Sequence, residues 1–229
     1  MALPRTLEPE VMDTEQEARD YDAMDHGDVN ARFCDDLLSL GVRLGRVLDV
    51  GTGPGLIPIE LCRRAPALRV DAIDLASHML ALAGRNVTRA GLADRIVLAR
   101  VDAKATGHDD GTYDAVVSNS IVHHIPEPAM VFREMWRLVR RGGALFVRDL
   151  ERPADAGRVT ELARTYAPIS AGDPEVRALH ERQHALLAAS LHAALTAEEV
   201  RAMVAPLGIP ASAVRTTSDR HWTLACVKS

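Results

Sequence analysis

Short apolar runs alternate with longer amphipathic stretches through the middle of the chain, and this pattern predicts strands that alternate with helices. The apolar runs have the length of buried strands, and in the stretches between them apolar residues recur at helical spacing. The expected strands are 46–50, 69–73, 96–100, 114–118 and 144–149, and the expected helices are 56–64, 77–90 and 128–139. Such an alternation is typical of a parallel sheet with helices on both faces.

The pattern changes on both sides of this central part. Residues 11–40 are acidic and predict one or two helices that end near Gly41. A Gly142–Gly143 pair predicts a turn before the fifth strand. After Asp149 the expected elements are helices over 155–167 and 174–195, a helix that a capping box opens at Thr196–Glu199, and strands near 213–217 and 221–227.

Composition and charge narrow the class of protein. The chain has 229 residues, of which 47% are hydrophobic and 26% charged, and its formal net charge is −5. A nucleic-acid binder usually carries a basic face, which this balance does not favour. The three cysteines (Cys34, Cys62 and Cys226) form no CxxC pair and suit a reducing compartment. With no apolar run at the N-terminus and only a short Ala-rich stretch from Ala185 to Leu195, we expect a soluble cytoplasmic protein without a membrane partner.

The strongest local signal is the sequence RVLDVGTGPG at 46–55. A buried strand leads into Gly51, Gly53 and Gly55, and a helix begins near Leu56. Glycines allow a tight turn and let a ligand approach the backbone. In sheets of this kind ligands bind beyond the carboxyl ends of the strands.

The glycine spacing and the charge of the loop distinguish a dinucleotide from S-adenosylmethionine as the ligand. A dinucleotide motif GxGxxG would need glycine where Leu56 stands, and Pro54 removes one amide donor. Asp49 would repel a pyrophosphate but suit the ammonium and sulfonium of S-adenosylmethionine, unless it merely accepts hydrogen bonds from loop amides. The sequence therefore favours S-adenosylmethionine over a nicotinamide dinucleotide.

Several motifs in order resemble the class I S-adenosylmethionine-dependent methyltransferases. They are VLDVGTGPG, DAIDLASHML, VDA, YDAVVSNSIVHHIPEP and RRGGALFVRD, within residues 46–150. The pattern is similar to the small-molecule branch that includes quinone-ring methyltransferases. The resemblance implies an α/β fold that is Rossmann-like and doubly wound, with a mostly parallel sheet, a late antiparallel strand, helices on both faces and a helical lid insertion.

We accordingly expect one methyltransferase domain over residues 1–229. Its expected parts are an N-terminal helical cap (1–45), a cofactor-binding core (46–150), a helical lid segment (151–210) and closing strands (211–229).

The resemblance also implies a set of cofactor-binding residues. The glycine loop would approach the methionyl and ribose parts, and Asp74 would accept both ribose hydroxyls, for which a carboxylate has two acceptor oxygens. Met79 would pack on the adenine, unless it is an ordinary core residue, and Asp102 would read the adenine edge, unless it only forms a turn. The full expected set is Tyr21, Asp49, Gly51, Thr52, Gly53, Gly55, Asp74, Leu75, Met79, Asp102, Ala103, Asn119 and Ser120.

Candidate acceptor-side residues follow the fourth and fifth expected strands. His123 and His124 are adjacent in a short loop, so we expect one of them to face the site and the other to pack the loop. Arg148 either binds a substrate carboxylate or pairs internally with Asp149 or Glu151. A general base is optional, because the sulfonium already activates the methyl carbon.

One metal motif stands apart from these signals. His180–His184 reads HExxH, but the glycine and histidine that would follow in a metzincin are replaced by Leu187 and Ser190. We interpret it as a polar helix face and expect no metal site.

The sequence thus predicts in-line methyl transfer from S-adenosylmethionine to a small-molecule acceptor, and leaves oligomeric state open. The alternatives are a non-catalytic module that binds the cofactor or its demethylated product, an RNA or protein methyltransferase, and an NAD-dependent oxidoreductase. Asn119-Ser-Ile-Val stands where enzymes that methylate nucleic-acid amino groups carry a Pro-Pro motif, which disfavours a nucleic-acid partner.

Overall fold

The computed structural model describes residues 3–11, 13–22 and 27–229. The strands of this part are β1 (Leu44–Val50), β2 (Ala67–Asp74), β3 (Ile96–Arg100), β4 (Tyr113–Asn119), β5 (Val139–Leu150), β6 (Val214–Thr216) and β7 (His221–Val227). They form a seven-stranded sheet in the order β3-β2-β1-β4-β5-β7-β6. Pairs from β3 to β5 are parallel, whereas β7 is antiparallel to both β5 and β6. This confirms the predicted doubly wound, mostly parallel α/β fold.

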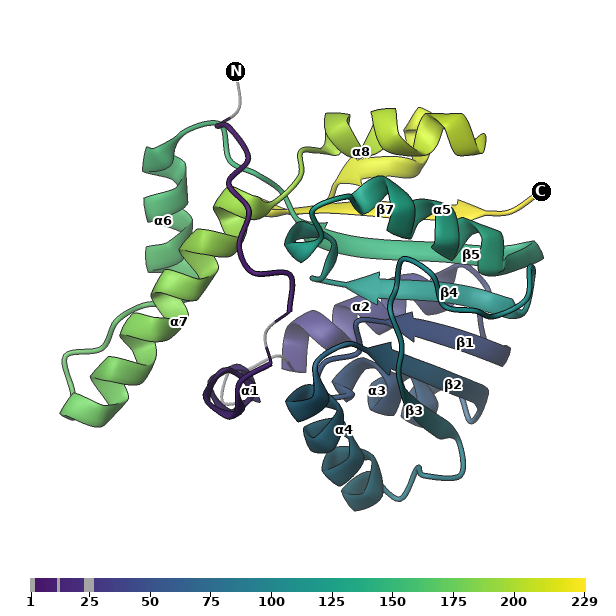
Figure 1. Ribbon diagram of the computed structural model, residues 1–229, viewed down its shortest axis with the longest axis horizontal. Coiled ribbons are helices and arrows are strands. Elements are labelled where there is room, and N and C mark those ends of the chain that lie inside the picture. The colour runs from purple at the N-terminus through teal and green to yellow at the C-terminus, as the bar shows by residue number, and fades with distance from the viewer. Residues whose placement is uncertain (1–2, 12, 23–26) are drawn as a thin grey trace.

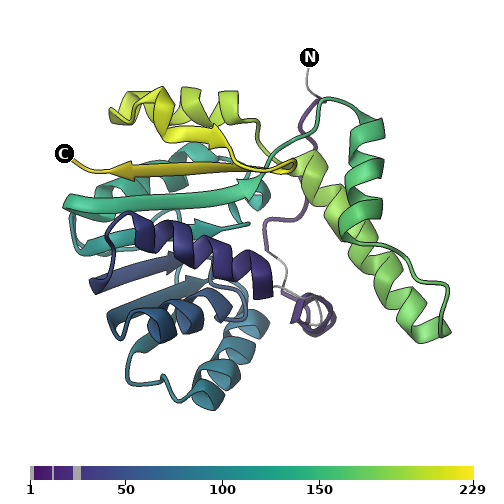
Figure 2. The same ribbon diagram turned by 180° about the vertical axis from the view of Figure 1, so that it is seen from behind.

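Helices lie on both faces of the sheet (Figures 1 and 2). They are α1 (Glu15–Asp22), α2 (Gly27–Ser39), α3 (Leu56–Arg64), α4 (Ser77–Ala90), α5 (Pro128–Leu138), α6 (Ala156–Tyr166), α7 (Pro174–Ala193) and α8 (Ala197–Val204), with single 3-10 turns η1 (Val122–His124), η2 (Ala205–Leu207) and η3 (Ala211–Ala213). One buried cluster joins α5 and α8 to one face, and a second joins α2 and α3 to the other. Apolar residues at helical spacing, such as Val131, Met135 and Leu138 of α5, account for this packing.

The connection between α5 and β5 differs from the sequence prediction. The Gly142–Gly143 pair was expected in a turn before the strand, but β5 begins at Val139, directly after α5. Val139 pairs with Tyr113 and Ala144 with Ala115, so the residues between them bulge from the ladder. Gly142 has a φ of 75°, which glycine adopts at low cost. The glycines therefore permit the bulge rather than end a helix.

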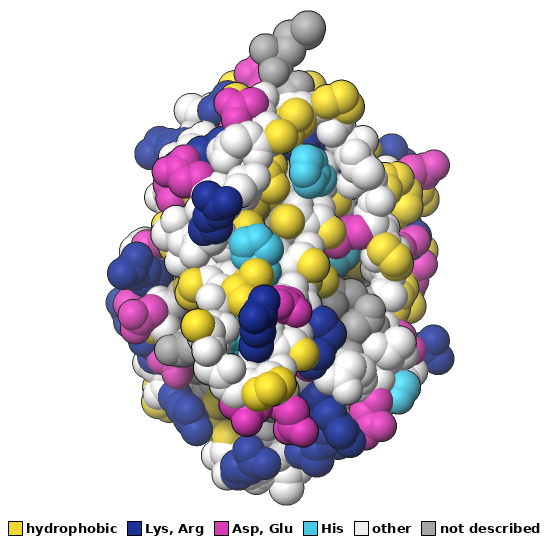
Figure 3. Space-filling model, turned by 90° about the vertical axis from the view of Figure 1, so that its left-hand side faces the viewer, with side chains coloured by type: hydrophobic (Ala, Val, Ile, Leu, Met, Phe, Trp, Pro, Cys, Tyr) yellow, Lys and Arg dark blue, Asp and Glu magenta, His cyan; other side chains and the backbone are white. Residues whose placement is uncertain are grey.

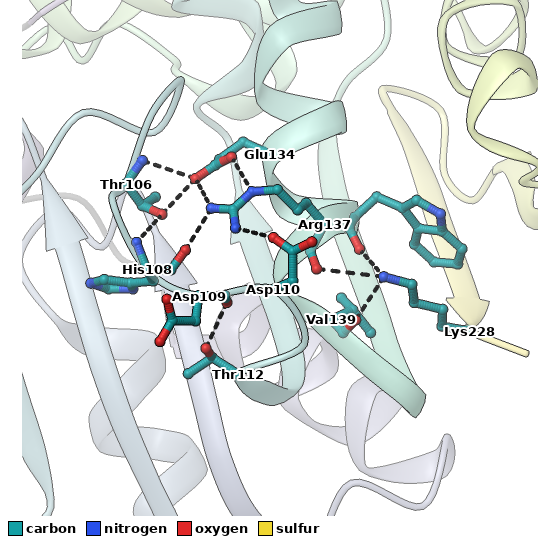
Figure 4. Close-up of polar contacts among 10 residues, drawn as sticks. Thr106, His108, Asp109, Asp110, Thr112, Glu134, Arg137, Val139 and Lys228 are labelled. Atoms are coloured by element: carbon teal, nitrogen blue, oxygen red, sulfur yellow. Dashed lines mark hydrogen bonds and ion pairs between the residues drawn. The ribbon is translucent and has the colours of Figure 1, made fainter.

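Lys228 donates hydrogen bonds to backbone carbonyl oxygens at the carboxyl end of α5 (Figure 4). Lys228 Nζ donates to the carbonyl oxygens of Trp136 at 2.6 Å and Val139 at 2.8 Å. Arg137 on the same helix donates to both carboxylate oxygens of Glu134 and to the carbonyl of His108. Cations near the carboxyl end of a helix complement the unpaired carbonyls there. This arrangement holds the end of α5 at the start of β5, next to β4, whose carboxyl end borders the site described below.

Helices α6 and α7 pack on each other beyond the carboxyl ends of the strands, with α1 on the same side (Figures 1 and 2). The N-terminal segment 3–11 runs along this side, where Arg5 donates to the carbonyl oxygens of Ala193 at 2.7 Å and His123 at 3.0 Å. The division into cap, core, lid and closing strands stays a prediction. Of the helices in the described ranges, none combines the length and apolarity that a membrane span requires.

Candidate active site

A cleft opens at the carboxyl ends of β1, β2 and β4, on the side that faces α1. Its empty volume is about 1040 Å³, counting space open to solvent. Residues from the predicted cofactor set that line it are Tyr21, Asp49, Gly51, Thr52, Gly53, Asp74, Leu75, Met79, Asp102, Ala103, Asn119 and Ser120. The sheet brings these residues together because parallel strands end at the same edge.

The glycine loop is shaped by two positions in the cleft wall. Gly51 has a φ of 72°, and a Cβ there would lie 2.2 Å from Ile121 Cγ2. Gly53 has a φ of 53°, and a Cβ there would meet no described atom within 4 Å. At Gly51 the protein itself therefore requires glycine, whereas at Gly53 the absent side chain leaves space for a ligand to approach.

Gly55 was predicted to bind the cofactor, and the structure places it differently. It does not line the cleft. A Cβ on Gly55 would lie 3.1 Å from Ala83 Cβ on α4. The close approach of α3 and α4, with a φ of 74°, explains glycine at this position.

Asp49 is the most unusual acid of the cleft. It is 1% exposed, and burial raises the pKa of its carboxyl to about 7. Thr52 opposes this shift and Asp74 adds to it. Neither Asp49 Oδ2 nor Thr52 Oγ1 has a well-formed hydrogen bond among the described residues. A buried carboxylate oxygen without a partner calls for a cationic or hydrogen-bond-donating ligand.

Asp74 ends β2 and stiffens the glycine loop. Its Oδ2 accepts a hydrogen bond from Gly53 N at 2.8 Å, and its Oδ1 accepts one from Ala76 N at 2.9 Å. Burial raises the pKa of Asp74 despite these backbone donors. Each oxygen keeps a second lone pair that a vicinal diol could use.

The other end of the cleft is apolar with a few polar groups. Tyr21 packs with Ala76 and Met79 in a small cluster, and burial raises the pKa of the tyrosine to about 12. Met79 therefore belongs to the cleft wall rather than to the main core. Asp102 both forms a turn, accepting from Lys104 N at 2.8 Å, and lines the cleft.

Ser120 has a φ of 58° and is the single non-glycine residue with a positive φ among residues 3–11, 13–22 and 27–229. Its backbone N donates to the Arg148 carbonyl at 2.9 Å, which holds this conformation at the end of β4. Strained backbone of this kind clusters at functional sites. Ser120 also lines the cleft.

The two adjacent histidines have separate environments, as expected. His124 lines the cleft, whereas His123 is 3% exposed and lies behind it. His123 Nδ1 is 2.5 Å from Asp149 Oδ1, and the other oxygen of Asp149 accepts from Val122 N. Burial opposes protonation of His123, but Asp149 raises its pKa above the usual value. His123, predicted as a catalytic candidate, thus fixes the loop.

The predicted role of Arg148 is wrong. It was expected to bind a substrate carboxylate or to pair with Asp149 or Glu151. The guanidinium instead donates to Asp36 on α2 at 2.5 Å and to Thr223 Oγ1 at 2.9 Å. It lies over the Phe33 and Phe146 rings, on the face of the sheet that α2 covers. Strand residues alternate between faces, and that alternation turns Arg148 away from the cleft.

Sequence reasoning missed several residues of the cleft wall. Asn30 on α2 and Glu10 and Val11 of the N-terminal segment line it. No motif marks them, because they reach the cleft through tertiary packing. Asp25 and His26 follow Tyr21 on the N-terminal segment and are polar residues that could also reach the site, but they lie outside the described residues.

Within the described part of the chain, the HExxH histidines form no group of three potential metal ligands. His184 Nδ1 is 2.9 Å from the Ala167 carbonyl oxygen, and His180 Nδ1 accepts from Ser170 N at 3.3 Å. Both therefore contact the backbone between α6 and α7. Figure 3 shows the face that carries these helices, where apolar side chains lie among charged ones. Exposed apolar residues of α6, α7 and the segment between them are Tyr166, Ile169 and Val176.

The raised pKa of Asp49 predicts a pH-dependent affinity for a cationic ligand. At pH 7 the carboxyl is about half ionised, so the affinity should still rise slightly up to pH 7.5 and level off above about pH 8. Below pH 7 it must lose a proton to pair with a cation, so the dissociation constant should rise by up to about 10-fold per pH unit. Titration calorimetry with S-adenosylmethionine from pH 5.5 to 7.5 measures this. An equally steep dependence in Asp49→Asn would assign it to another group.

The sequence is similar to that of known methyltransferases. Residues 47–143 match a family model described as a methyltransferase domain. A phosphatidylethanolamine N-methyltransferase of Cereibacter sphaeroides is 35% identical over 58% of this chain and 58% of its own length. A demethylmenaquinone methyltransferase of Roseiflexus castenholzii is 34% identical over 48% of this chain and 44% of its own length. The chain thus spans about half the length of these curated relatives.

A similarity of fold extends further than the similarity of sequence. The crystal structure of a Methanococcus maripaludis protein, assigned as an S-adenosyl-L-methionine-dependent methyltransferase, has a TM-score of 0.69 with this chain. The superposition covers 98% of this chain and 97% of that protein at 20% identity. Elements outside residues 47–143, including α6 and α7, therefore have counterparts in a known fold.

Proposed function

We propose, on the premise that the chain carries a class I S-adenosylmethionine-dependent methyltransferase domain, that it transfers a methyl group to a small-molecule acceptor by in-line displacement. The observation that carries this proposal is the buried Oδ2 of Asp49 in the cleft wall, which has no well-formed hydrogen bond among the residues that the structure describes. When bound, S-adenosylmethionine supplies a methyl carbon that its sulfonium activates.

The residues of the cleft fit this cofactor. Asp49 offers a negative charge where a positively charged methionyl end would be held, and Gly53 leaves its side of the cleft open. Asp74 offers lone pairs for the ribose hydroxyls. Met79 and Asp102 line the part of the cleft where we expect the adenine ring to bind. The carboxylates also disfavour a pyrophosphate, which argues against a nicotinamide dinucleotide.

We place the acceptor beside His124, Ser120 and Ile121. This part of the cleft combines apolar side chains with few polar groups, which suits a compact, largely apolar molecule such as a quinone-type ring. The chain's own task would be to orient the acceptor atom and exclude water, which together supply much of the rate of a displacement reaction. The formal charge of −5 makes a nucleic acid a poor partner.

His124→Gln should separate acceptor chemistry from cofactor binding. His124 lines the cleft from the loop after β4, whereas Asp49 and Asp74 belong to β1 and β2. We therefore expect the substitution to affect the acceptor and to lower turnover by about 10-fold or more. The dissociation constant for S-adenosylmethionine should change by less than about 3-fold. Single-turnover rates and calorimetry on the same preparation measure the two quantities. A parallel loss of both would mean that the residue maintains the structure of the cleft.

Incubation with methyl-labelled S-adenosylmethionine and a metabolite extract tests the proposed function. Label should move into a small-molecule fraction with the wild-type protein and remain on the cofactor with Asp49→Asn. Cofactor binding without any transfer, to metabolites or to added protein, would instead identify a non-catalytic module that binds S-adenosylmethionine.

A further inference from the structure

A second polar cluster adjoins the cleft and shares with it only His124, and the proposed function leaves its other two members without a ligand role. Glu8 of the N-terminal segment meets His123 and His124 of η1, and one ligand atom from each lies within 4.8 Å of the others. The three side chains are 9%, 4% and 15% exposed. Two segments far apart in sequence thus bring two imidazoles and a carboxylate to one buried point.

Hydrogen bonding does not account for this cluster. Glu8 Oε1 and His124 Nδ1 are buried and have no hydrogen-bond partner among the described residues. Glu8 Oε1 is 3.6 Å from His123 Nε2 and 3.4 Å from His124 Nδ1. These separations are long for hydrogen bonds. They are close to the edge of about 3.3 Å in a tetrahedron of ligands at about 2.0–2.1 Å from a zinc ion.

The atoms around the cluster orient these ligands. Asp149 holds Nδ1 of His123, which leaves its Nε2 directed at Glu8. The His124 ring donates to the backbone carbonyl oxygen of Pro9, and the Ser190 hydroxyl contacts the Glu8 carboxylate. A carboxylate behind a histidine is the usual support of a metal-ligating imidazole. Arg5, the nearby cation, is occupied with the carbonyl oxygens of His123 and Ile125.

We propose that Glu8, His123 and His124 bind a divalent transition-metal ion of the zinc type. Two imidazoles and one carboxylate form a ligand set that zinc accepts, with a fourth position left for water. The ion ties the N-terminal segment to the loop after β4, beside the cleft. This site is separate from the HExxH motif and does not depend on methyl transfer.

Zinc titration of the chelator-treated full chain tests the site. Calorimetry should find one Zn²⁺ per chain in the wild type, and Glu8→Gln should weaken binding by more than about 100-fold, because loss of a ligand should cost more than the roughly 10- to 100-fold typical of losing an outer-shell partner. Glu10→Gln is the matched control, because Glu10 belongs to the same segment but pairs with Lys104. The His180→Ala/His184→Ala double variant is the second control. Both controls should bind Zn²⁺ like the wild type.

Co²⁺ provides a readout that is independent of folding stability and activity. Its visible absorption should be that of a four-coordinate site in the wild type and should be lost in Glu8→Gln, whose far-ultraviolet circular dichroism should stay unchanged. A wild type that binds neither ion overturns the proposal. Zn²⁺ binding that survives in Glu8→Gln but disappears in the His180/His184 double variant overturns it as well.

Discussion

Asp49→Asn is expected to weaken S-adenosylmethionine binding by about 30- to 1,000-fold, or about 2–4 kcal/mol, while leaving the protein at least as stable as the wild type. Affinity falls because the substitution removes the negative charge that would pair with the cationic methionyl end of the ligand. Asp49 Oδ2 has no well-formed hydrogen bond within the described ranges, and a neutral Asn can keep the contact with the Thr52 side chain, so the substitution costs little internal bonding.

The effect on stability has the opposite sign because burial raises the pKa of Asp49 to about 7. The folded state then holds the proton more tightly than the unfolded state, whose pKa is near the ordinary value of about 3.9. Stability contributed by the protonated form is full below that ordinary value and is lost as pH rises toward 7. Replacing Asp49 by neutral Asn should therefore stabilise the protein more at pH 8 than at pH 4.

Calorimetry and urea unfolding at the two pH values measure both effects. A variant that binds normally would remove Asp49 from the ligand site. A variant that is strongly destabilised at pH 8 would show that the carboxylate has a structural partner instead.

Asp74→Asn should weaken cofactor binding by about 30-fold, or about 2 kcal/mol, through loss of a charged acceptor. Asn is preferred to Ala because its side-chain oxygen can still accept from one of the two backbone amides of Gly53 and Ala76. The comparison of S-adenosylmethionine with a 2′-deoxy analogue makes the test specific. The wild type should bind S-adenosylmethionine more tightly than the 2′-deoxy analogue, and the difference in affinity should be smaller in the variant.

Asp71→Asn is a matched control on the same strand. Asp71 accepts from Tyr113 OH at 2.7 Å and does not line the cleft. It should therefore leave cofactor affinity unchanged. Unchanged affinity in Asp74→Asn as well would contradict the assignment of the acid at the end of β2.

The sequence predicted the sheet and the glycine loop well because both depend on local patterns. Alternating apolar runs determine the strands, and Gly51 and Gly53 have positive φ values, as glycines in the predicted tight turn can. Arg148 was placed wrongly and Gly55 has a structural reason to be glycine, in both cases because of tertiary packing. Gly55 admits the close approach of Ala83, and the pleat of β5 directs Arg148 to Asp36 on the far face of the sheet.

The other features that sequence could not reveal involve partners distant along the chain. Asn30 reaches the cleft from α2, and Glu8 meets the two histidines only after the N-terminal segment has crossed the site. HExxH has metal-ligand spacing but lies against backbone carbonyl and amide groups, whereas the cluster at Glu8 has no motif. Spacing along one helix is visible in a sequence, but convergence of separate segments is not.

The most direct test of the central claim is calorimetric titration of the wild-type chain with S-adenosylmethionine and S-adenosylhomocysteine, beside NAD and NADH, at pH 7.5. We predict saturable binding of both sulfur nucleosides at one site per chain and no binding of the nicotinamide compounds. Absence of heat from either sulfur nucleoside, together with tight binding of a nicotinamide dinucleotide, would contradict the account.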